Sequence, residues 1–323
     1  MNYGLPYQGS KNRIAKRLVE ALPAAPVLYD VFCGGCAVTH AAMLSGKYQH
    51  FVINDRRGWL PDAFRVAING GYAHEDRWIS REDFEHLRST DAYAAMCFSF
   101  GNDCQSYMYA RGLEPYKRAL HHAIFWRDIA PWAELCPETA DALAAGLAPI
   151  EDRKQRRVQA GKFIARSLKA QLAAGTLTPD ILQKPIYRQI RGPKDTPHSL
   201  ERLGSLESLE RLERLERLES LPDTLAAYSG DYRELCYDEP GIIYCDPPYK
   251  DTADKSKDYA DTSFDAEAFY SWCERQALPV YISEYQMPEE RFVCVAEWDK
   301  VTRMAAKTTN HVTERLWRPR AQL

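Results

Sequence analysis

The stretch from Gly241 to Tyr249, with the sequence GIIYCDPPY, constrains the fold of this chain more than any other. Its Ile and Tyr residues favour a pleated, buried strand. Pro247 and Pro248 cannot continue a central strand or donate to its hydrogen-bond ladder, so the chain must leave the sheet at Asp246. In open α/β sheets, ligands bind just beyond the carboxyl ends of the strands. The stretch therefore predicts an α/β sheet with Asp246 and Tyr249 at its ligand-binding edge.

This turn carries groups that can hold a planar ring with an exocyclic amine. The Asp246 carboxylate and the Pro247 carbonyl can both accept a hydrogen bond from an NH2 group, and Tyr249 can stack on the ring. The alternative is a plain surface turn, in which Asp246 begins the loop and Tyr249 packs on a neighbour. The strand before the turn and the aromatic residue after it favour the binding interpretation.

The overall composition limits the class of protein. The 323 residues suffice for one large domain with an insertion, or for two domains. The formal net charge is −3, so any surface for nucleic acid must be local. No apolar segment approaches the roughly 18 residues of a membrane span, and the first residues have no apolar signal core, which predicts a cytoplasmic protein. Nine scattered cysteines fit reduced thiols.

The first 55 residues resemble the opening of a nucleotide-binding βαβ unit. The motif YQGSK at 7–11 precedes a helical pattern, and a strand at 27–32 runs into Cys33, Gly34, Gly35 and a helix of small residues. A second strand ends at Asp55. Glycines let a ligand approach N–H groups at a helix start, and an acid about 20 residues later can accept from ribose hydroxyls. This order favours ligand binding over tight packing alone.

Cys33 and Cys36 form a Cys-x-x-Cys pattern in the same turn, and that pattern also occurs in thiol redox sites. A zinc ribbon requires a second such pair, which the sequence lacks. Redox chemistry would leave Asp246 unexplained, so we expect two buried cysteines and no metal.

The middle of the chain is mostly helical in pattern and rich in basic residues. Most runs of charge are solvated helix faces. In a slightly acidic chain, however, this clustering favours a phosphate-facing surface. The basic residues assigned to it are Arg153, Arg156, Arg157, Lys162, Arg188, Arg191 and Lys194.

Residues 199–221 carry a leucine at every third position. A period of three does not match the 3.6 residues of an α-helical turn, so the leucines precess around the axis. A 3₁₀-helix would align them, but such runs rarely exceed one turn. Glutamate and arginine four residues apart favour an α-helix over disorder, and Pro222 ends it. We expect a helical spacer outside the catalytic core, with no single face that docks as tightly as an ordinary core helix does.

The order of these features resembles the Dam-type DNA adenine-N6 methyltransferases, especially the versions carried by phages and prophages. The likeness covers roughly 1–56 and 228–323, and its specific part is Asp-Pro-Pro-Tyr at 246–249. It implies an α/β fold with a Rossmann-like methyltransferase sheet, helices on both faces, and a mostly helical inserted DNA-recognition region. The expected catalytic domain, which binds S-adenosylmethionine, comprises 1–56 and 222–323. The expected recognition insertion is 57–198, and the spacer is 199–221.

The resemblance implies methyl transfer from S-adenosylmethionine to N6 of an adenine that is flipped out of double-stranded DNA. The adenine would be held by Asp246, Pro247, Pro248 and Tyr249, and the DNA by the basic residues named above. The residues that would hold the cofactor are Tyr7, Gly9, Ser10, Lys11, Asp30, Phe32, Cys33, Gly34, Asp55 and Asp246. The family usually has a glycine two residues beyond Gly34, and this chain departs from that pattern with Cys36.

Three alternatives stay open. Glutamine-N5 protein methyltransferases share a Pro-Pro-Tyr turn but normally place it soon after the cofactor glycines. Cytosine-N4 methylation of DNA uses the same chemistry, and spacing only favours adenine. A catalytically inactive DNA-binding regulator is opposed by intact Asp246 and Tyr249. A bacterial restriction-modification setting fits the resemblance, and the sequence indicates neither the recognised DNA site nor the oligomeric state.

Overall fold

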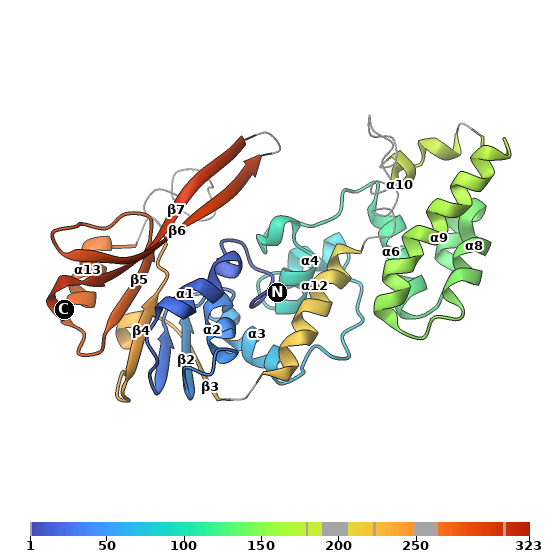
Figure 1. The fold of residues 1–323 in the computed structure, drawn as a ribbon. Helices are drawn as coiled ribbons and strands as arrows, with labels where there is room; N and C mark the ends of the chain where they lie inside the picture. Colours follow the sequence, from blue (N-terminus) through green and yellow to red (C-terminus); the bar gives the residue numbers. More distant parts are fainter. Residues whose placement is uncertain (1, 179, 189–205, 222–223, 249–263, 306–307) are drawn as a thin grey trace. The chain divides into compact units, whose positions relative to one another are not determined.

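The computed structural model describes the backbone of residues 2–178, 180–188, 206–221, 224–248, 264–305 and 308–323 (Figure 1). The chain divides into two compact units. The first, here called the sheet unit, comprises Met1–Gly71 and Glu216–Leu323, and the second, the helical unit, comprises Tyr72–Leu215. The expected catalytic domain lies within the sheet unit. Within the described residues, no helix is both long enough and apolar enough to cross a membrane.

The sheet unit contains seven strands in the order β3-β2-β1-β4-β5-β7-β6. Strands β1 to β5 pair in parallel, and β7 pairs antiparallel with both β5 and β6. This is the Rossmann order with one antiparallel strand inserted before the last position. The strands are β1 (Val27–Asp30), β2 (His50–Asp55), β3 (Leu225–Ser229), β4 (Gly241–Cys245), β5 (Val280–Glu284), β6 (Phe292–Ala305) and β7 (Thr308–Pro319). The predicted α/β class and Rossmann-like sheet are confirmed.

Helices cover both faces of this sheet, as strand alternation requires. On one face, Tyr29, Ile243 and Ile282 pack with Phe269 and Trp272 of α13. The intervening strand residues point to the other face, where α1 and α2 lie against each other. The helical segments of the unit are η1 (Lys11–Arg13), α1 (Ala15–Ala21), α2 (Ala37–Met43), α3 (Trp59–Ile68), η5 (Arg217–Ser220), η6 (Tyr232–Glu234), α13 (Ala266–Arg275) and η7 (Arg320–Gln322).

Strand β4 is central and begins at a glycine for a steric reason. A Cβ at Gly241 would lie 2.5 Å from the carbonyl oxygen of Val27, so no side chain fits there. Ile243 and Cys245 are both fully buried. Beyond the sheet, β6 and β7 continue as a long two-stranded hairpin (Figure 1). The predicted strand before Asp246 is therefore confirmed at the heart of the sheet.

The helical unit is built from capped helices. Ser80, Asp91 and Asp152 each accept a hydrogen bond from a backbone N–H in the first turn of the helix that follows. Its segments are α4 (Arg81–Leu87), α5 (Ala92–Cys97), η2 (Phe100–Asn102), α6 (Glu114–Phe125), α7 (Ala130–Leu135), α8 (Pro137–Leu147), α9 (Arg153–Ala173), η3 (Ile181–Gln183), α10 (Pro185–Arg188) and α12 (Glu207–Glu216).

The leucine repeat is helical where the structure describes it. Helix α12 ends the helical unit and runs directly into η5, the 3₁₀ turn that opens the second part of the sheet unit. Leu209, Leu212 and Leu215 are at most 1% exposed, so the expectation that no face of the repeat docks tightly was wrong. Leu218 lies in η5 and Leu221 follows as its extended C-cap, and both are buried. The leucines of the repeat thus remain buried where the α-helix gives way to the 3₁₀ turn.

Candidate active site

Four acidic residues lie where the parallel strands of the sheet unit end. Asp30, Asp55 and Glu284 are the last residues of β1, β2 and β5, and Asp246 follows β4 directly. Asp30 is in register with Tyr244 of β4. Parallel strands in register bring their carboxyl ends to one edge, so the acids lie along that edge. They flank β1 and β4, where the strand order reverses and where ligands bind in sheets of this kind.

The turn between β1 and α2 is held by Asp55. Its Oδ2 accepts from the N–H of Gly34 at 2.9 Å, and its Oδ1 accepts from the N–H of Arg57 at 2.9 Å. Tyr7 lies against the turn, because a Cβ at Gly34 would be 3.4 Å from its ring carbon Cε1. A carboxylate has about four acceptor positions, so Asp55 can still accept from a ligand hydroxyl while it holds the turn.

The two cysteines of the turn are buried, as expected, at 7% and 0% exposure for Cys33 and Cys36. Burial raises the pKa of both thiols, which disfavours the reactive thiolate. Cys36 has a left-handed backbone, with φ 54° and ψ 33°. That conformation costs a side-chain-bearing residue about 1 kcal/mol. Glycine adopts it freely, which gives a physical reason for the glycine that the resembling family has at this place.

Asp30 carries an unsatisfied acceptor. The side chain is 1% exposed, and its Oδ2 accepts a hydrogen bond from Oγ1 of Thr39 at 2.6 Å. Its Oδ1 is buried and has no hydrogen-bond partner among the described residues. Burial raises the pKa of Asp30 to about 7, the hydrogen bond from Thr39 opposes this, and the charges of Asp246 and Asp55 add to it. A buried acceptor without a donor fits a ligand that brings an N–H group.

Lys11 brings a buried cation to Asp246. Lys11 is 6% exposed, and its Nζ lies 2.8 Å from Oδ1 of Asp246 and 3.5 Å from Oε1 of Glu314, a fully buried residue of β7. Burial by itself lowers the pKa of Lys11, but the charges of Asp246 and Glu314 outweigh it and raise that pKa above its ordinary value. Lys11 therefore stays protonated between the two carboxylates.

Glu284 adds a neutral carboxyl group beside this cluster. It is 8% exposed, and its Oε1 accepts from the N–H of Tyr285 at 2.8 Å. Burial raises the pKa of Glu284 to about 8, with the charge of Asp246 adding to the effect and that of Lys11 opposing it. At neutral pH the side chain is mostly protonated.

The remaining residues of the predicted adenine-binding turn are only partly described. Pro247 is buried, and no described residue donates a hydrogen bond to its carbonyl oxygen. Pro248 is exposed. Tyr249 lies outside the described residues. The Asp246 and Pro247 acceptors that the sequence predicted are thus adjacent at the end of β4.

Three further residues of the predicted cofactor set lie in the sheet unit. Phe32 is half-buried, and its ring centroid lies 5.0 Å from that of Tyr232. The Ser10 hydroxyl is buried without a hydrogen-bond partner among the described residues. Gly9 is exposed with φ 78°, a left-handed conformation that suits glycine. Within the predicted cofactor set, the contacts join Tyr7 and Asp55 to the turn at Gly34 and Lys11 to Asp246.

Sequence reasoning missed Glu284 and Glu314. Glu284 ends a strand just as Asp55 does, and that position could have identified it. Glu314 gave no such signal, because a glutamate in an alternating strand is normally expected to face solvent. Only the structure shows that it lies beneath Lys11.

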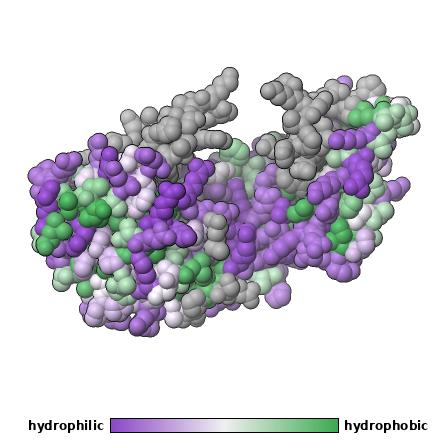
Figure 2. Space-filling model, in the orientation of Figure 1, coloured by the Kyte–Doolittle hydropathy of each residue, from purple (hydrophilic) through white to green (hydrophobic). Residues whose placement is uncertain are grey.

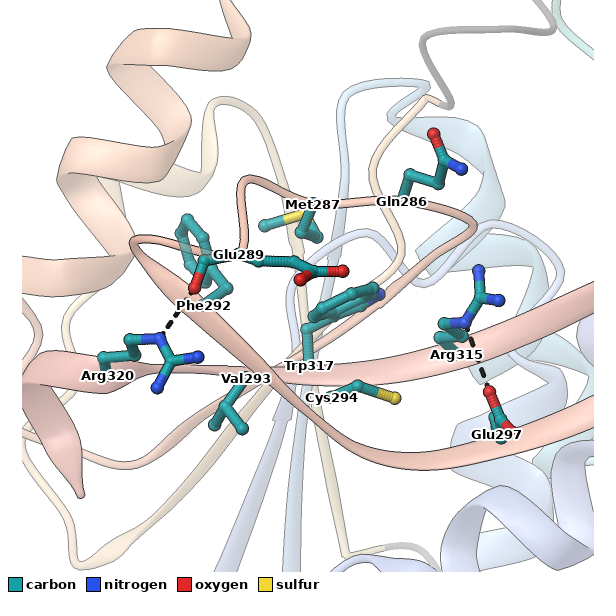
Figure 3. A pocket seen from close by; sticks show the side chains of 10 residues that line it. All are labelled: Gln286, Met287, Glu289, Phe292, Val293, Cys294, Glu297, Arg315, Trp317 and Arg320. Atoms are coloured by element: carbon teal, nitrogen blue, oxygen red, sulfur yellow. Dashed lines mark hydrogen bonds and ion pairs between the residues drawn. The ribbon is translucent and has the colours of Figure 1, made fainter.

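A separate groove of about 590 Å³ lies beside β7, lined by residues of the β5–β6 connection and both strands of the hairpin. Figure 3 shows Trp317 at its centre, with the Arg315–Glu297 contact on one side and the Arg320–Glu289 contact on the other. None of the four strand-end acids lines it. The Trp317 indole donates to the carbonyl of Glu284 at 3.0 Å, so the groove wall supports the backbone at the end of β5.

The basic residues predicted to contact DNA differ in their surroundings. Arg156 is 6% exposed and donates to the carbonyls of Ile124, Ile150 and Glu151. Arg157 is paired with glutamates of α12. These contacts give both guanidinium groups structural roles within the helical unit, instead of the expected phosphate-facing role.

Other basic residues of the predicted set are placed differently. The Arg153 guanidinium lies over the Phe125 ring, 4.9 Å from its centroid. Lys162 is exposed on α9. The Arg188 side chain, Arg191 and Lys194 lie outside the described residues. Hydrophilic side chains cover most of the face of the molecule seen in Figure 2, so surface polarity alone does not single out one basic patch.

The strand order, with acids at the carboxyl ends of the parallel strands, is that of a Rossmann-like methyltransferase sheet. Residues 7–96 match the family model of the D12 class N6 adenine-specific DNA methyltransferases. The match supports an adenine-specific DNA methyltransferase that is similar to the D12 class over these residues, and the open choice between adenine and cytosine is decided in favour of adenine. A comparison with curated proteins finds no match. The matched segment includes the turn at Gly34 and Asp55 but ends before Asp246.

Proposed function

We propose that the sheet unit binds a flipped-out adenine at Asp246 and Pro247, with Tyr249 stacked on the base. The observation that carries this proposal is the position of Asp246. It lies just beyond central strand β4, beside β1, and is held by a buried ammonium group at 2.8 Å. The paired acceptors at Asp246 and Pro247 suit the two N–H bonds of an exocyclic amine. An adenine stacked in a duplex would be out of reach, so the base must leave the helix.

We further propose that the turn at Gly34 holds the cofactor. Asp30 supplies a buried acceptor oxygen without a donor, Gly34 leaves the turn free of side-chain atoms, and Asp55 retains acceptor positions for a hydroxyl pair. These features fit the ammonium group and ribose of S-adenosylmethionine. When bound, the cofactor supplies a methyl group activated by a sulfonium centre.

The residues around the amine then act by orientation and charge. The adenine amine is a poor nucleophile, because its lone pair is delocalised into the ring. Hydrogen bonds to Asp246 and Pro247 favour a pyramidal nitrogen whose lone pair points away from the ring plane. As the nitrogen–methyl bond forms, the carbon–sulfur bond would break to leave a neutral thioether, and the positively charged nitrogen would then release a proton to water. The negative charge of Asp246 stabilises that developing positive charge.

For the DNA surface, we propose an exposed stripe on α9 in place of the engaged arginines. Lys154, Lys162, Arg166 and Lys169 are all exposed, and their spacing of eight, four and three residues places them near one helical face. Lysine and arginine side chains held along a helix can neutralise successive phosphates. A double-stranded substrate is proposed on the same basis. A cytoplasmic location and a phage or prophage origin remain predictions.

The central experiment replaces Asp246 by alanine. Unmethylated amplified DNA and labelled S-adenosylmethionine are the substrates, and nucleoside analysis identifies the product. We expect wild-type protein to yield N6-methyladenine, and we expect the Asp246→Ala variant to lose transfer by about 1000-fold or more while it keeps cofactor affinity. Wild-type-like transfer by the variant would show that the amine is held elsewhere. Loss of cofactor binding by the variant would show that Asp246 contacts the cofactor instead of the amine.

A further inference from the structure

The cluster around Lys11 contains one carboxylate more than a simple ion pair requires. Lys11 Nζ and Asp246 Oδ1 already form a contact of 2.8 Å. Glu314, from β7, adds a second carboxylate oxygen at 3.5 Å from the same ammonium group, with no exposure to solvent at all. A buried carboxylate carries a desolvation penalty of several kcal/mol, on the order that ion pairing only just offsets. A side chain held at that cost in an active site calls for a chemical reason.

The charge of the three groups supplies that reason. Lys11 and Asp246 alone would sum to zero, and the ammonium would cancel the negative charge that Asp246 offers to the amine. Counted at their formal charges, Lys11, Asp246 and Glu314 sum to one negative charge (+1 − 1 − 1), and Glu314 supplies the second carboxylate. The amine of the substrate becomes positive in the transition state. A net negative cluster next to it lowers the barrier, whereas a neutral cluster does so less.

The groups that face Lys11 come from several elements. Besides Asp246 after β4 and Glu314 on β7, they include Tyr285, whose interaction with Lys11 also raises the lysine pKa. Glu284 at the end of β5 is close enough for its own titration to respond to Lys11, Asp246 and Glu314.

We propose that Glu314 is a positioning residue of the methyl-transfer reaction, acting on Asp246 through Lys11. It holds the ammonium group from the side of β7 and leaves the cluster with the negative charge that the reacting amine requires. The proposal rests on the proposed role of Asp246 at the target amine.

The test compares Glu314→Gln with Glu314→Asp and with a matched control. Glu138→Gln is the control, because Glu138 forms a similar partly buried pair with Lys184, at 2.8 Å, in the helical unit. Single-turnover methylation of amplified DNA is measured from pH 6 to pH 10.5, with cofactor binding by calorimetry. We expect Glu314→Gln to lower the rate about tenfold with unchanged cofactor affinity. We expect Glu314→Asp to recover part of that loss and Glu138→Gln to leave the rate unchanged.

The pH profile separates this role from a purely structural one. Glu314 raises the pKa of Lys11, so its neutralisation lets burial lower that pKa. Loss of the Lys11 proton releases Asp246 from its 2.8 Å contact and so lowers the rate. The alkaline limb of the rate profile should therefore move to lower pH in Glu314→Gln and stay in place in Glu138→Gln. The position of the limb does not depend on how much variant protein folds. A wild-type alkaline limb in Glu314→Gln would overturn the proposal, whatever the rate.

If Asp246→Asn retained transfer, the proposed function itself would fail. An inactive Asp246→Asn with a normal Glu314→Gln would overturn only the role of Glu314.

Discussion

Among the described residues, each unit holds a cation between two carboxylates, and the cation is buried in the sheet unit and partly buried in the helical unit. In the sheet unit, Lys11 lies between Asp246 and Glu314. In the helical unit, Arg157 of α9 bonds Glu213 through Nε and Nη2, at 2.9 and 3.0 Å, and Glu210 through Nη1 at 2.8 Å. The guanidinium is a rigid fork that fixes one helix on another. The ammonium is a compact point charge whose effect on Asp246 depends on the other charge beside it.

The two clusters have similar charges but lie in different places, and their locations indicate different roles. The Lys11 cluster lies beyond the strand ends, in the region where ligands bind to such sheets. The Arg157 cluster lies along a seam between two helices, with Glu213 8% exposed. We therefore propose that similar charges serve chemistry in one place and helix packing in the other.

The largest expected difference between the clusters is their response to pH. The fold raises the pKa of Glu284 from 4.5 to about 8, because burial favours its neutral form. The stability that this shift contributes is complete below about pH 4.5 and is lost as the pH rises through 8. We expect the sheet unit to lose on the order of 4 kcal/mol between pH 5 and pH 9. Hydrogen exchange read separately for the two units checks this, and Glu284→Gln should flatten the dependence.

The second largest expected effect is the loss of stability when the Arg157 guanidinium is removed. Arg157→Met leaves the buried Glu213 without its guanidinium, and breaking a buried pair in this way costs about 3 kcal/mol or more. Denaturant unfolding should show the loss, and hydrogen exchange should localise it to α9 and α12. Affinity for S-adenosylmethionine should remain that of the wild type. Weakened cofactor binding in this variant would contradict the division of roles.

A smaller effect is expected from Asp55. Removing an acceptor from a buried ligand hydroxyl costs about 1–3 kcal/mol, so Asp55→Ala should weaken cofactor affinity by that amount in calorimetry. Asp55 also holds the N–H of Gly34. Asp55→Asn is the informative companion, since it keeps one acceptor oxygen. If affinity were unchanged in both variants, the ribose acceptor would have to be another residue.

The smallest expected effect concerns the exposed stripe on α9. Replacing Lys162, Arg166 and Lys169 by glutamine should flatten the slope of log affinity against log salt by about 0.9 for each lost phosphate contact. Arg156→Gln serves as the contrast, because its guanidinium is bonded to carbonyls within the unit. It should destabilise the helical unit without a comparable change in slope. An unaltered slope in the triple variant would identify α9 as a solvated face.

Local patterns were enough to predict the parallel sheet and the place of Asp246. An apolar run that ends in two prolines permits few structures, and a glycine turn followed by an acid after the next strand permits few more. Glu314 could not be found in this way, because its burial depends on how β7 returns to pair with β5. Arg156 and Arg157 were misjudged because a count of charges does not reveal the carbonyls and glutamates that the fold brings to them.

The leucine repeat affects how α12 finds its register against the rest of the helical unit. A screw shift of α12 by one triplet, about 4.5 Å, would place leucine on leucine and glutamate on glutamate, so neither kind of residue defines the register. The register is defined by the third residue of each triplet, which is neither leucine nor glutamate. Ser208 is 2% exposed and accepts a hydrogen bond from the Tyr109 hydroxyl at 3.0 Å, whereas Arg211 reaches the carbonyls of Met96 and Ser99. One slip would force an arginine into the serine position, and the opposite slip would leave the two carbonyls without their donor. The change from serine to arginine within α12 is therefore the feature that distinguishes one register from the next.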